Sequence, residues 1–332
     1  MNTSNPMVSV ALMSYNQEAY IRQAMDCILA QKTNYSFEVV VGDDGSTDGT
    51  RAIALEYEAK HPGIVRVLPK EPNKKVLGNF RDTVNACRGK YVAVCHSDDY
   101  WHNPLKLEKQ ISFLENNPDY GVVHTDAHFL LTSNGAIIEN YNSKNQPAVF
   151  DGKIFEALIT NKFFLNTLTV CFKKTLFDEH VNINEYIGAG FTYEDLPTWL
   201  ELSIRTNFKY LPESMATYRI MQESISRSKD LTKRFGFLKN HYVIKKYFIQ
   251  KYNVSKDIEE EFDLMYHRKK FAMAFKWRSY AEALDSFAFL KQKKEVNIKL
   301  RVQKIFLRYP VFHTALKNIK KLYVPKTAAS QI

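Results

Sequence analysis

Apolar and polar residues follow one another in blocks along the first 125 residues, and the blocks predict strands that alternate with helices. Each predicted strand is a short, uniformly apolar run, and most are followed by apolar residues at helical spacing. Uniformly apolar strands are typical of a mainly parallel sheet that helices cover on both faces. The predicted strands are Val8–Met13, Phe37–Val41, Ile64–Leu68, Tyr91–Cys95 and Tyr120–His124, and the predicted helices are Gln17–Gln31, Asp48–Lys60, Val76–Cys87 and one that Asn103 and Pro104 open and that ends near Asn116.

The rest of the chain divides into a polar stretch and a basic, helical region. Residues 132–151 are rich in Ser, Asn and Gly and predict a long loop or small insertion. Residues 1–225 contain 21 Lys and Arg against 27 Asp and Glu, whereas residues 226–332 contain 25 against 9. We therefore expect an α/β domain over residues 1–227 and a basic helical region over 228–332, with different partners.

Composition excludes several classes of protein. The four cysteines form no CxxC pair, which predicts a reducing compartment and neither disulfides nor a zinc site. No signal peptide and no apolar stretch of about 18 residues is found, so we expect a cytoplasmic protein. Neither a GxxxxGK[ST] nor a GxGxxG motif occurs. The positive charge lies in the tail, and we expect no nucleic-acid partner.

Acidic pairs follow two of the predicted strands. Asp43-Asp44 and Asp98-Asp99 come directly after strand ends, as does Tyr15. Because ligands of such sheets bind beyond the carboxyl ends of the strands, we expect these side chains on one rim. Ordinary turn chemistry is the alternative for either pair alone. A sugar nucleotide explains both, since a divalent cation would join one pair to a diphosphate while the other accepts hydrogen bonds from base and ribose.

Three segments carry a resemblance to a known family. They read VSVALMSYNQEAYIRQAMDCILAQ, FEVVVGDDGSTDGT and GKYVAVCHSDDYWHNPLKLEKQISFLENNPDYGVV. In order and spacing they resemble the family 2 glycosyltransferases of GT-A fold, over residues 7–226. The resemblance implies a mixed, mainly parallel sheet flanked by helices, a nucleotide-diphosphate-sugar donor, a Mn²⁺ or Mg²⁺ ion and inversion at the anomeric carbon.

The resemblance also implies a nucleotide site. Tyr15 would pack on the base, and Asp44 would hydrogen-bond to it. Asp43 would support the turn or the ribose, and Asp98 would contact the ribose or sugar. The full nucleotide-binding set it implies is Ser14, Tyr15, Asn16, Asp43, Asp44 and Asp98.

Metal binding and proton transfer are implied at two further places. Asp99 would be the principal metal ligand, although position 96, often acidic in the family, is His96 here. Glu194 and Asp195 resemble the family's ED motif, so Asp195 would be the general base and Glu194 would orient it or the acceptor. The alternative is that this acidic pair merely caps a helix.

Other assignments depend on weaker motifs. Arg219 and Ser224 lie in a segment that resembles the family's YR-x-H-x-x-S-x-S and are candidates for the diphosphate, but the histidine position is Met221. Trp101 and Trp199 are candidates for the sugar or acceptor, with local packing as the alternative for Trp101.

The sequence therefore predicts an inverting glycosyltransferase that adds one sugar per cycle. A UDP-sugar is the favoured donor, and a glycan or lipid-linked glycan in surface polysaccharide synthesis is the expected acceptor. Basic and apolar residues interleave in Lys299–Lys326. This pattern predicts either that the segment attaches to the anionic inner face of the cell membrane or that it packs on the catalytic domain. The alternatives are a sugar nucleotidyltransferase and a non-catalytic sugar-nucleotide-binding module.

Overall fold

The computed structural model describes residues 5–145, 151–162, 164–221 and 230–308. These residues form two units. The first contains the described residues up to 221 together with Val243–Asn253, and the second contains residues 230–242 and those from Val254 onward. Helix α10 (Leu231–Lys251) contributes to both units. Val243–Asn253, which lies beyond the domain boundary expected near residue 227, thus belongs to the first unit.

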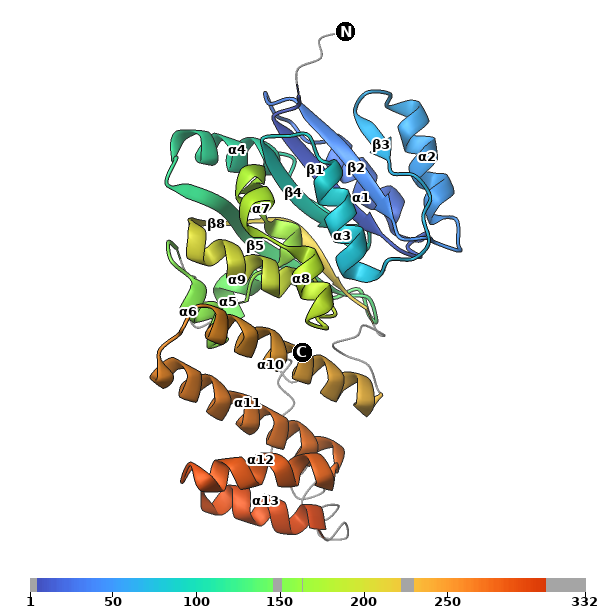
Figure 1. The fold of residues 1–332 in the computed structure, drawn as a ribbon. Helices are drawn as coiled ribbons and strands as arrows, with labels where there is room; N and C mark the ends of the chain where they lie inside the picture. The colour runs from blue at the N-terminus through green and yellow to red at the C-terminus, as the bar shows by residue number, and fades with distance from the viewer. Residues whose placement is uncertain (1–4, 146–150, 163, 222–229, 309–332) are drawn as a thin grey trace. The chain divides into compact units, whose positions relative to one another are not determined.

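The first unit is built on an eight-stranded sheet (Figure 1). Its strands are β1 (Val8–Ser14), β2 (Phe37–Asp43), β3 (Val65–Val67), β4 (Tyr91–His96), β5 (Tyr120–Leu131), β6 (Ile137–Ile138), β7 (Cys171–Lys173) and β8 (Asn207–Ile220). The path runs β3-β2-β1-β4-β7-β5-β6, and β8 pairs with β5. The first four strands are parallel, as are β5 and β8, whereas β7 runs antiparallel to both β4 and β5. The predicted mainly parallel sheet is therefore confirmed.

Helices cover both faces of this sheet. They are α1 (Ile21–Leu29), α2 (Thr50–Lys60), α3 (Lys75–Ala86), α4 (Lys106–Asn116), α5 (Tyr141–Asn145), α6 (Phe155–Ile159), α7 (Lys174–His180), α8 (Ile183–Gly188) and α9 (Asp195–Arg205). Alternate residues of β1, such as Val10, form one buried core with Ile21 of α1 and Leu107 of α4. On the opposite face α3 lies so close that a Cβ on Gly42 would be 1.8 Å from Thr83 Oγ1.

The predicted elements differ from the observed ones mainly at their ends. The helix expected at Asn103 begins at Lys106, because Asn103 Oδ1 accepts the Leu105 amide at 2.9 Å and forms a turn before it. The residues from Gln17 likewise form a turn, and α1 starts at Ile21. The expected strand at Tyr120 continues to Leu131 because β8 pairs along its whole length.

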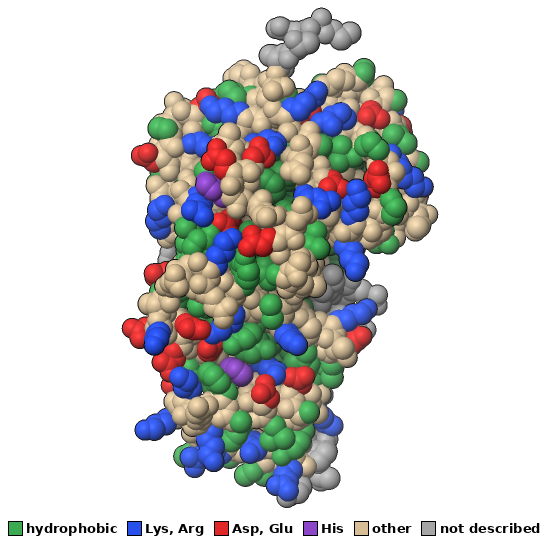
Figure 2. Space-filling model, viewed as in Figure 1, with side chains coloured by type: hydrophobic (Ala, Val, Ile, Leu, Met, Phe, Trp, Pro, Cys, Tyr) green, Lys and Arg blue, Asp and Glu red, His purple; other side chains and the backbone are tan. Residues whose placement is uncertain are grey.

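The second unit is helical, as predicted. It contains α11 (Lys256–Trp277), α12 (Tyr280–Gln292) and α13 (Ile298–Arg308), which share a core around Phe271, Phe287 and Leu307. Basic side chains surround hydrophobic ones on the visible face of α12 and α13 (Figure 2). Within the described residues, no helix combines the length and the apolar character needed to cross a bilayer.

Candidate active site

The ends of three parallel strands meet at one edge of the sheet. Pairing of β1 with β2 sets Ser14 beside Asp43, and pairing of β1 with β4 sets Met13 beside His96. The polar residues that follow these strands consequently emerge side by side. The structure thus brings together the acidic pairs and Tyr15, as the sequence predicted.

The Asp43 carboxylate stabilises the turn after β2. Its side chain is fully buried and accepts a hydrogen bond from Ser46 Oγ, and Arg51 Nη1 lies 3.7 Å from Asp43 Oδ2. Ser46 Oγ in turn accepts the Asn16 amide at 2.9 Å, which joins this turn to the residues after β1. Asp43 therefore supports the turn.

Asp44 faces a different loop. Its Oδ1 accepts the Lys74 amide at 2.7 Å, and its backbone oxygen accepts Asn73 Nδ2 at 2.9 Å. Burial raises the pKa of the Asp44 carboxyl, although the Lys74 amide lowers it. The turn at Gly45 is tight, since its φ is +73° and a Cβ there would lie 3.2 Å from the Asn73 backbone nitrogen.

The residues after β1 differ in exposure. Ser14 Oγ accepts a hydrogen bond from Ser97 Oγ at 2.7 Å and so links the ends of β1 and β4. Asn16 has a φ of 50°, and its Oδ1 accepts the Thr47 amide at 2.8 Å. Tyr15 lies between them with 48% of its surface exposed. Its ring is thus available to a planar ligand such as a nucleotide base.

A three-residue cluster of metal-binding type follows β4. Ligand atoms of His96, Asp98 and Asp99 all lie within 4.8 Å of one another. Asp99 is 1% exposed, and its Oδ1 accepts the Arg219 amide at 2.8 Å. Burial and the neighbouring charge of Asp98 raise the pKa of Asp99 well above its ordinary value. A cation at this cluster would relieve that unfavourable burial of negative charge.

Arg219 of β8 contacts the cluster through its backbone amide, which bonds to Asp99. Its guanidinium stacks between two rings, 4.8 Å from the centroid of Tyr20 and 4.7 Å from that of Tyr100. It also donates hydrogen bonds to the backbone oxygen of Asp98 and to Gln23 Oε1. In this arrangement the guanidinium holds the turn that carries the acidic pair.

The first turn of α9 reaches the same cluster. Glu194, the residue before α9, lies with Oε1 3.0 Å from His96 Nε2. Burial lowers the pKa of His96, but the hydrogen bond and charge of Glu194 raise it on balance to about 9. Asp195 opens the helix, and burial together with the charge of Glu194 raises its pKa to about 7. A carboxylate with that pKa exchanges protons near neutral pH.

The donor atoms in the cluster suit a divalent cation. Within the described part of the chain, neither Asp99 Oδ2 nor the Asp98 carboxylate makes a hydrogen bond. Carboxylate oxygens are the usual ligands of Mg²⁺ and Mn²⁺, and imidazole nitrogen is a ligand of transition metals. The residues present therefore fit the cation that the resemblance implies.

The residues that follow β1, β2 and β4 lie in a segment that matches a known protein family. The profile of glycosyl transferase family 2 matches residues 9–182, slightly more than half of the chain. The chain belongs to glycosyl transferase family 2.

Relatives of this family 2 chain include proteins of Mycobacterium tuberculosis and Bacillus subtilis. The uncharacterized protein Rv1520 of Mycobacterium tuberculosis is 33% identical over 213 residues, which are 64% of this chain and 58% of that protein. This chain thus matches somewhat more than half the length of its mycobacterial relative. TuaG of Bacillus subtilis, a glycosyltransferase named for teichuronic acid biosynthesis, is 30% identical over 231 residues, which are 69% of this chain and 85% of TuaG.

Solved structures of similar fold contain nucleotides. S. aureus TarS 1–349 in complex with UDP has a TM-score of 0.56 at 17% identity, covering 96% of this chain and 93% of that one. The mannosyltransferase PcManGT of Pyrobaculum calidifontis, in complex with GDP-Man and Mn²⁺, has a TM-score of 0.54 at 17% identity, covering 96% of this chain and 88% of that one. These likenesses establish a GT-A-type fold for the family 2 chain.

Two tryptophans predicted for the sugar or acceptor are buried instead. Trp101 is 1% exposed, donates from Nε1 to the Leu168 oxygen at 3.0 Å, and carries Lys106 Nζ 4.1 Å above its ring. Trp199 is 2% exposed and meets the ring of Phe172 edge-on. Neither indole presents a face to solvent, and the packing alternative describes Trp101. Ser224 lies outside the described residues.

Sequence reasoning missed several residues that build the site. His96 was noted only as a departure from the family pattern, although its place at the end of β4 signals a role. Arg219 contacts three residues that are far from it in sequence: the rings of Tyr20 and Tyr100 and the side-chain oxygen of Gln23. No local pattern could have identified that contact, because it forms only when α1 and the end of β8 meet.

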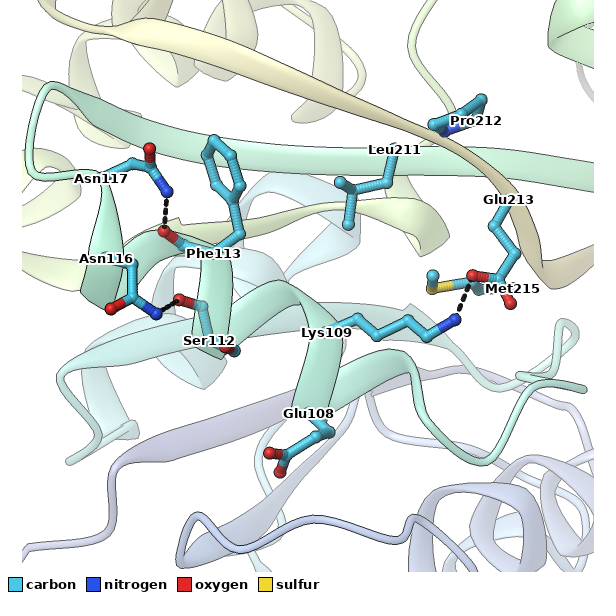
Figure 3. Close-up of a pocket in the computed structure, with 10 residues that line it drawn as sticks. All are labelled: Glu108, Lys109, Ser112, Phe113, Asn116, Asn117, Leu211, Pro212, Glu213 and Met215. Atoms are coloured by element: carbon cyan, nitrogen blue, oxygen red, sulfur yellow. Dashed lines mark hydrogen bonds and ion pairs between the residues drawn. The ribbon is translucent and has the colours of Figure 1, made fainter.

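A separate pocket of about 590 Å³ lies between α4 and β8 (Figure 3). Its polar side chains bond to neighbouring groups: Lys109 pairs with Glu213, and the Asn116 amide donates to the Ser112 oxygen at 2.8 Å. No strand-end residue of the candidate active site lines it. The strand-end cluster therefore remains the candidate active site.

Proposed function

We propose that the chain is an inverting glycosyltransferase that moves one sugar from a nucleotide-diphosphate sugar to a hydroxyl group. The observation that carries this proposal is the 3.0 Å contact between His96 and Glu194. It joins the metal-type cluster after β4 to the start of α9, where Asp195 provides a carboxylate with a pKa of about 7. The residues proposed to bind the diphosphate and the carboxylate proposed as general base would therefore be adjacent.

The donor would lie along the strand ends. Tyr15 offers an exposed ring to the base, and Asp44 would accept hydrogen bonds from donors of the base. The diphosphate would lie toward Asp98 and Asp99. A UDP-sugar is our favoured donor, because the similar TarS structure contains UDP, although the similar PcManGT contains GDP-Man.

A cation held by Asp99 would neutralise the diphosphate and so make it a better leaving group. Mn²⁺ or Mg²⁺ would serve, and the similar PcManGT structure is a complex with Mn²⁺. Asp98 adds a second carboxylate to the same cluster.

Asp195 would act as the general base. Its carboxylate would accept the proton of an acceptor hydroxyl while that oxygen forms a bond to the anomeric carbon. The bond from that carbon to the diphosphate breaks on the opposite side, so the configuration inverts. Glu194 keeps the first turn of α9 against His96 and so holds Asp195 in place.

The acceptor we propose is a glycan or lipid-linked glycan in surface polysaccharide synthesis. The name of its relative TuaG supports a cell-wall polymer. Such an acceptor is compatible with a cytoplasmic enzyme on the inner face of the membrane, and α13 offers a basic surface for attachment. We propose no nucleic-acid partner, since the strand-end rim is acidic.

A panel of nucleotide sugars tests this function. The full chain is incubated with each donor, with and without Mn²⁺, and donor hydrolysis is measured beside binding by calorimetry. We expect one donor to bind and to be hydrolysed slowly only with the cation. Binding of a donor without any hydrolysis or transfer would favour the non-catalytic module, and release of pyrophosphate from a nucleoside triphosphate would favour the nucleotidyltransferase.

A further inference from the structure

Glu194 contacts the imidazole of His96 in addition to standing next to Asp195 at the start of α9. A carboxylate that orients the base could stand alone, yet Glu194 is only 4% exposed in its side chain and is aimed at an imidazole. The two residues are 98 positions apart in sequence. The pair therefore joins two elements, the end of β4 and the start of α9.

The arrangement has the form of a metal ligand with an oriented ring. A histidine that ligates a metal donates its other ring N–H to a carboxylate or carbonyl, which fixes the tautomer and the ring's orientation. Here Glu194 engages Nε2, and Nδ1 has no hydrogen-bond partner within the described residues. The His96 ring also lies in the cluster with Asp98 and Asp99.

We propose that His96 supplies a nitrogen ligand to the divalent cation of this site, and that Glu194 is the positioning residue that orients its ring. The inference rests on the proposed function insofar as that function places a cation at Asp99. It adds that the cation and the first turn of α9 share one hydrogen-bonded frame, so that metal binding and placement of Asp195 are coupled.

A nitrogen ligand also bears on which cation is used. Mg²⁺ prefers an all-oxygen shell and keeps several waters, whereas imidazole suits transition metals. The wild-type chain should therefore bind Mn²⁺ more tightly than Mg²⁺. His96→Asp, which offers oxygen in place of nitrogen, should narrow that difference.

The direct test is a spectroscopic one on the full chain. The protein is labelled with ¹⁵N-histidine, loaded with Mn²⁺ and UDP, and studied by electron spin-echo envelope modulation. We expect coupling from a directly bound histidine nitrogen. His96→Asp should bind Mn²⁺ and lose the coupling, while His180→Asn, at a surface histidine, should keep it. Bound Mn²⁺ without nitrogen coupling in the wild type overturns the proposal.

Glu194 is tested by Mn²⁺ affinity rather than by rate. Loss of a carboxylate that orients a ligand typically lowers metal affinity about 10–100-fold. Glu194→Gln should show that loss while thermal unfolding stays near wild type, and Glu179→Gln, at an exposed position, should show none. Unchanged affinity in Glu194→Gln contradicts its role.

The outcomes separate this inference from the proposed function. Donor turnover without nitrogen coupling would leave the glycosyltransferase proposal standing and remove His96 from the metal. Nitrogen coupling in a chain that neither binds nor turns over any nucleotide sugar would leave the metal site standing and remove the function.

Discussion

At the residue scale, Asp195 lies beside a second carboxylate at the start of α9. Burial and the charge of Glu194 disfavour the ionised form of Asp195. Its carboxylate therefore binds a proton more strongly than an ordinary aspartate does, as a general base requires. The Leu196 amide donates a hydrogen bond to Asp195 Oδ1 at 2.6 Å. An asparagine could keep that bond, which makes Asp195→Asn a clean variant.

We expect Asp195→Asn to lower kcat while donor affinity stays nearly unchanged. General-base catalysis typically contributes about 10²–10⁴-fold, so the loss should fall in that range. Transfer kinetics at saturating donor and calorimetry measure the two quantities. A variant that loses donor affinity but keeps its rate at saturation would show that Asp195 binds the donor rather than the proton.

The same variant should become more stable relative to the wild type as pH rises. In the folded chain the pKa of Asp195 is about 7, against about 3.9 for an unfolded aspartate. Between these values the unfolded state gives up its proton more readily, so the wild type loses stability as pH rises from about 4 to about 7. Asparagine does not ionise. Urea unfolding with EDTA should therefore show the free energy of unfolding of Asp195→Asn rising relative to that of the wild type between about pH 4 and about pH 7. An identical pH dependence in the two proteins would contradict the raised pKa.

Asp99 makes the need for a cation testable. We expect excess EDTA to abolish donor hydrolysis and Mn²⁺ to restore it, because the diphosphate would otherwise leave as an unneutralised anion. Asp99→Asn should keep the Arg219 amide satisfied through Oδ1 and retain its fold, yet fail to respond to Mn²⁺. Hydrolysis and circular dichroism provide the two readouts. Full activity in excess EDTA would contradict the assignment of Asp99 as a ligand of a required cation.

At the element scale, the sequence predicted strands at the positions of β1 to β5 and missed β6, β7 and β8. β1, β2 and β4 are apolar almost throughout, so their pattern is unambiguous. β7 spans only three residues, and β8 mixes exposed and buried positions around a register shift. Local patterns cannot specify such strands, since their pairing with β5 defines them.

The same limit applies to the site. Asp43, Asp44, Asp98 and Asp99 were predictable because strand ends of a parallel sheet share one edge. The contacts of Arg219 with Tyr20 and of His96 with Glu194 were not, because each joins segments far apart in sequence. Burial likewise decided against Trp101, whose position beside Asp99 in sequence suggested exposure to the sugar.

Helix α10 shows why the first unit extends beyond residue 228. Lys245 is 1% exposed and donates to the backbone oxygens of Leu158 and Ile159 and to Asn161 Oδ1, at the end of α6. Buried Glu201 of α9 likewise accepts Lys251 Nζ at 3.0 Å. The C-terminal half of α10 is therefore bound into the unit that carries the site.

We expect Lys245→Met to destabilise the first unit by about 1–3 kcal/mol, because the Ile159 carbonyl and Asn161 Oδ1 would lose a charged hydrogen-bond donor. Urea unfolding measures the loss. Lys239→Met, at an exposed lysine of the same helix, is the matched control and should be near neutral. Equal effects of the two variants would mean that residues Val243–Asn253 do not support the fold of the first unit.

At the scale of the whole molecule, positive charge concentrates in the C-terminal region, and α13 adds exposed apolar side chains to it. Helix α13 packs through Leu307 and Leu300. It leaves Ile298, Val302 and Ile305 exposed at 81%, 41% and 56%. Val302 and Ile305 belong to the segment Lys299–Lys326 in which basic and apolar residues interleave, and both side chains are exposed within this unit. The helix carries four basic residues and no acidic one: Lys299, Arg301, Lys304 and Arg308.

An anionic membrane matches both features of α13. Each Lys or Arg near an anionic leaflet contributes on the order of 1 kcal/mol, and the exposed aliphatic side chains can insert at the headgroup boundary. We expect the full chain to sediment with vesicles that contain phosphatidylglycerol, to ignore neutral vesicles, and to come off in high salt. Substitution is preferable to truncation, because Leu307 belongs to the core of the second unit.

The three exposed residues decide between attachment and a purely structural helix. Replacing Ile298, Val302 and Ile305 together by serine should weaken vesicle binding strongly, while helix content and donor hydrolysis stay at wild-type levels, since none of the three is buried. Leu284→Ser, at a partly exposed residue of α12, is the matched control and should leave vesicle binding intact. If the wild-type chain fails to bind anionic vesicles, or if the triple variant unfolds the second unit, α13 serves the fold, and the basic charge of the region must be explained by another partner.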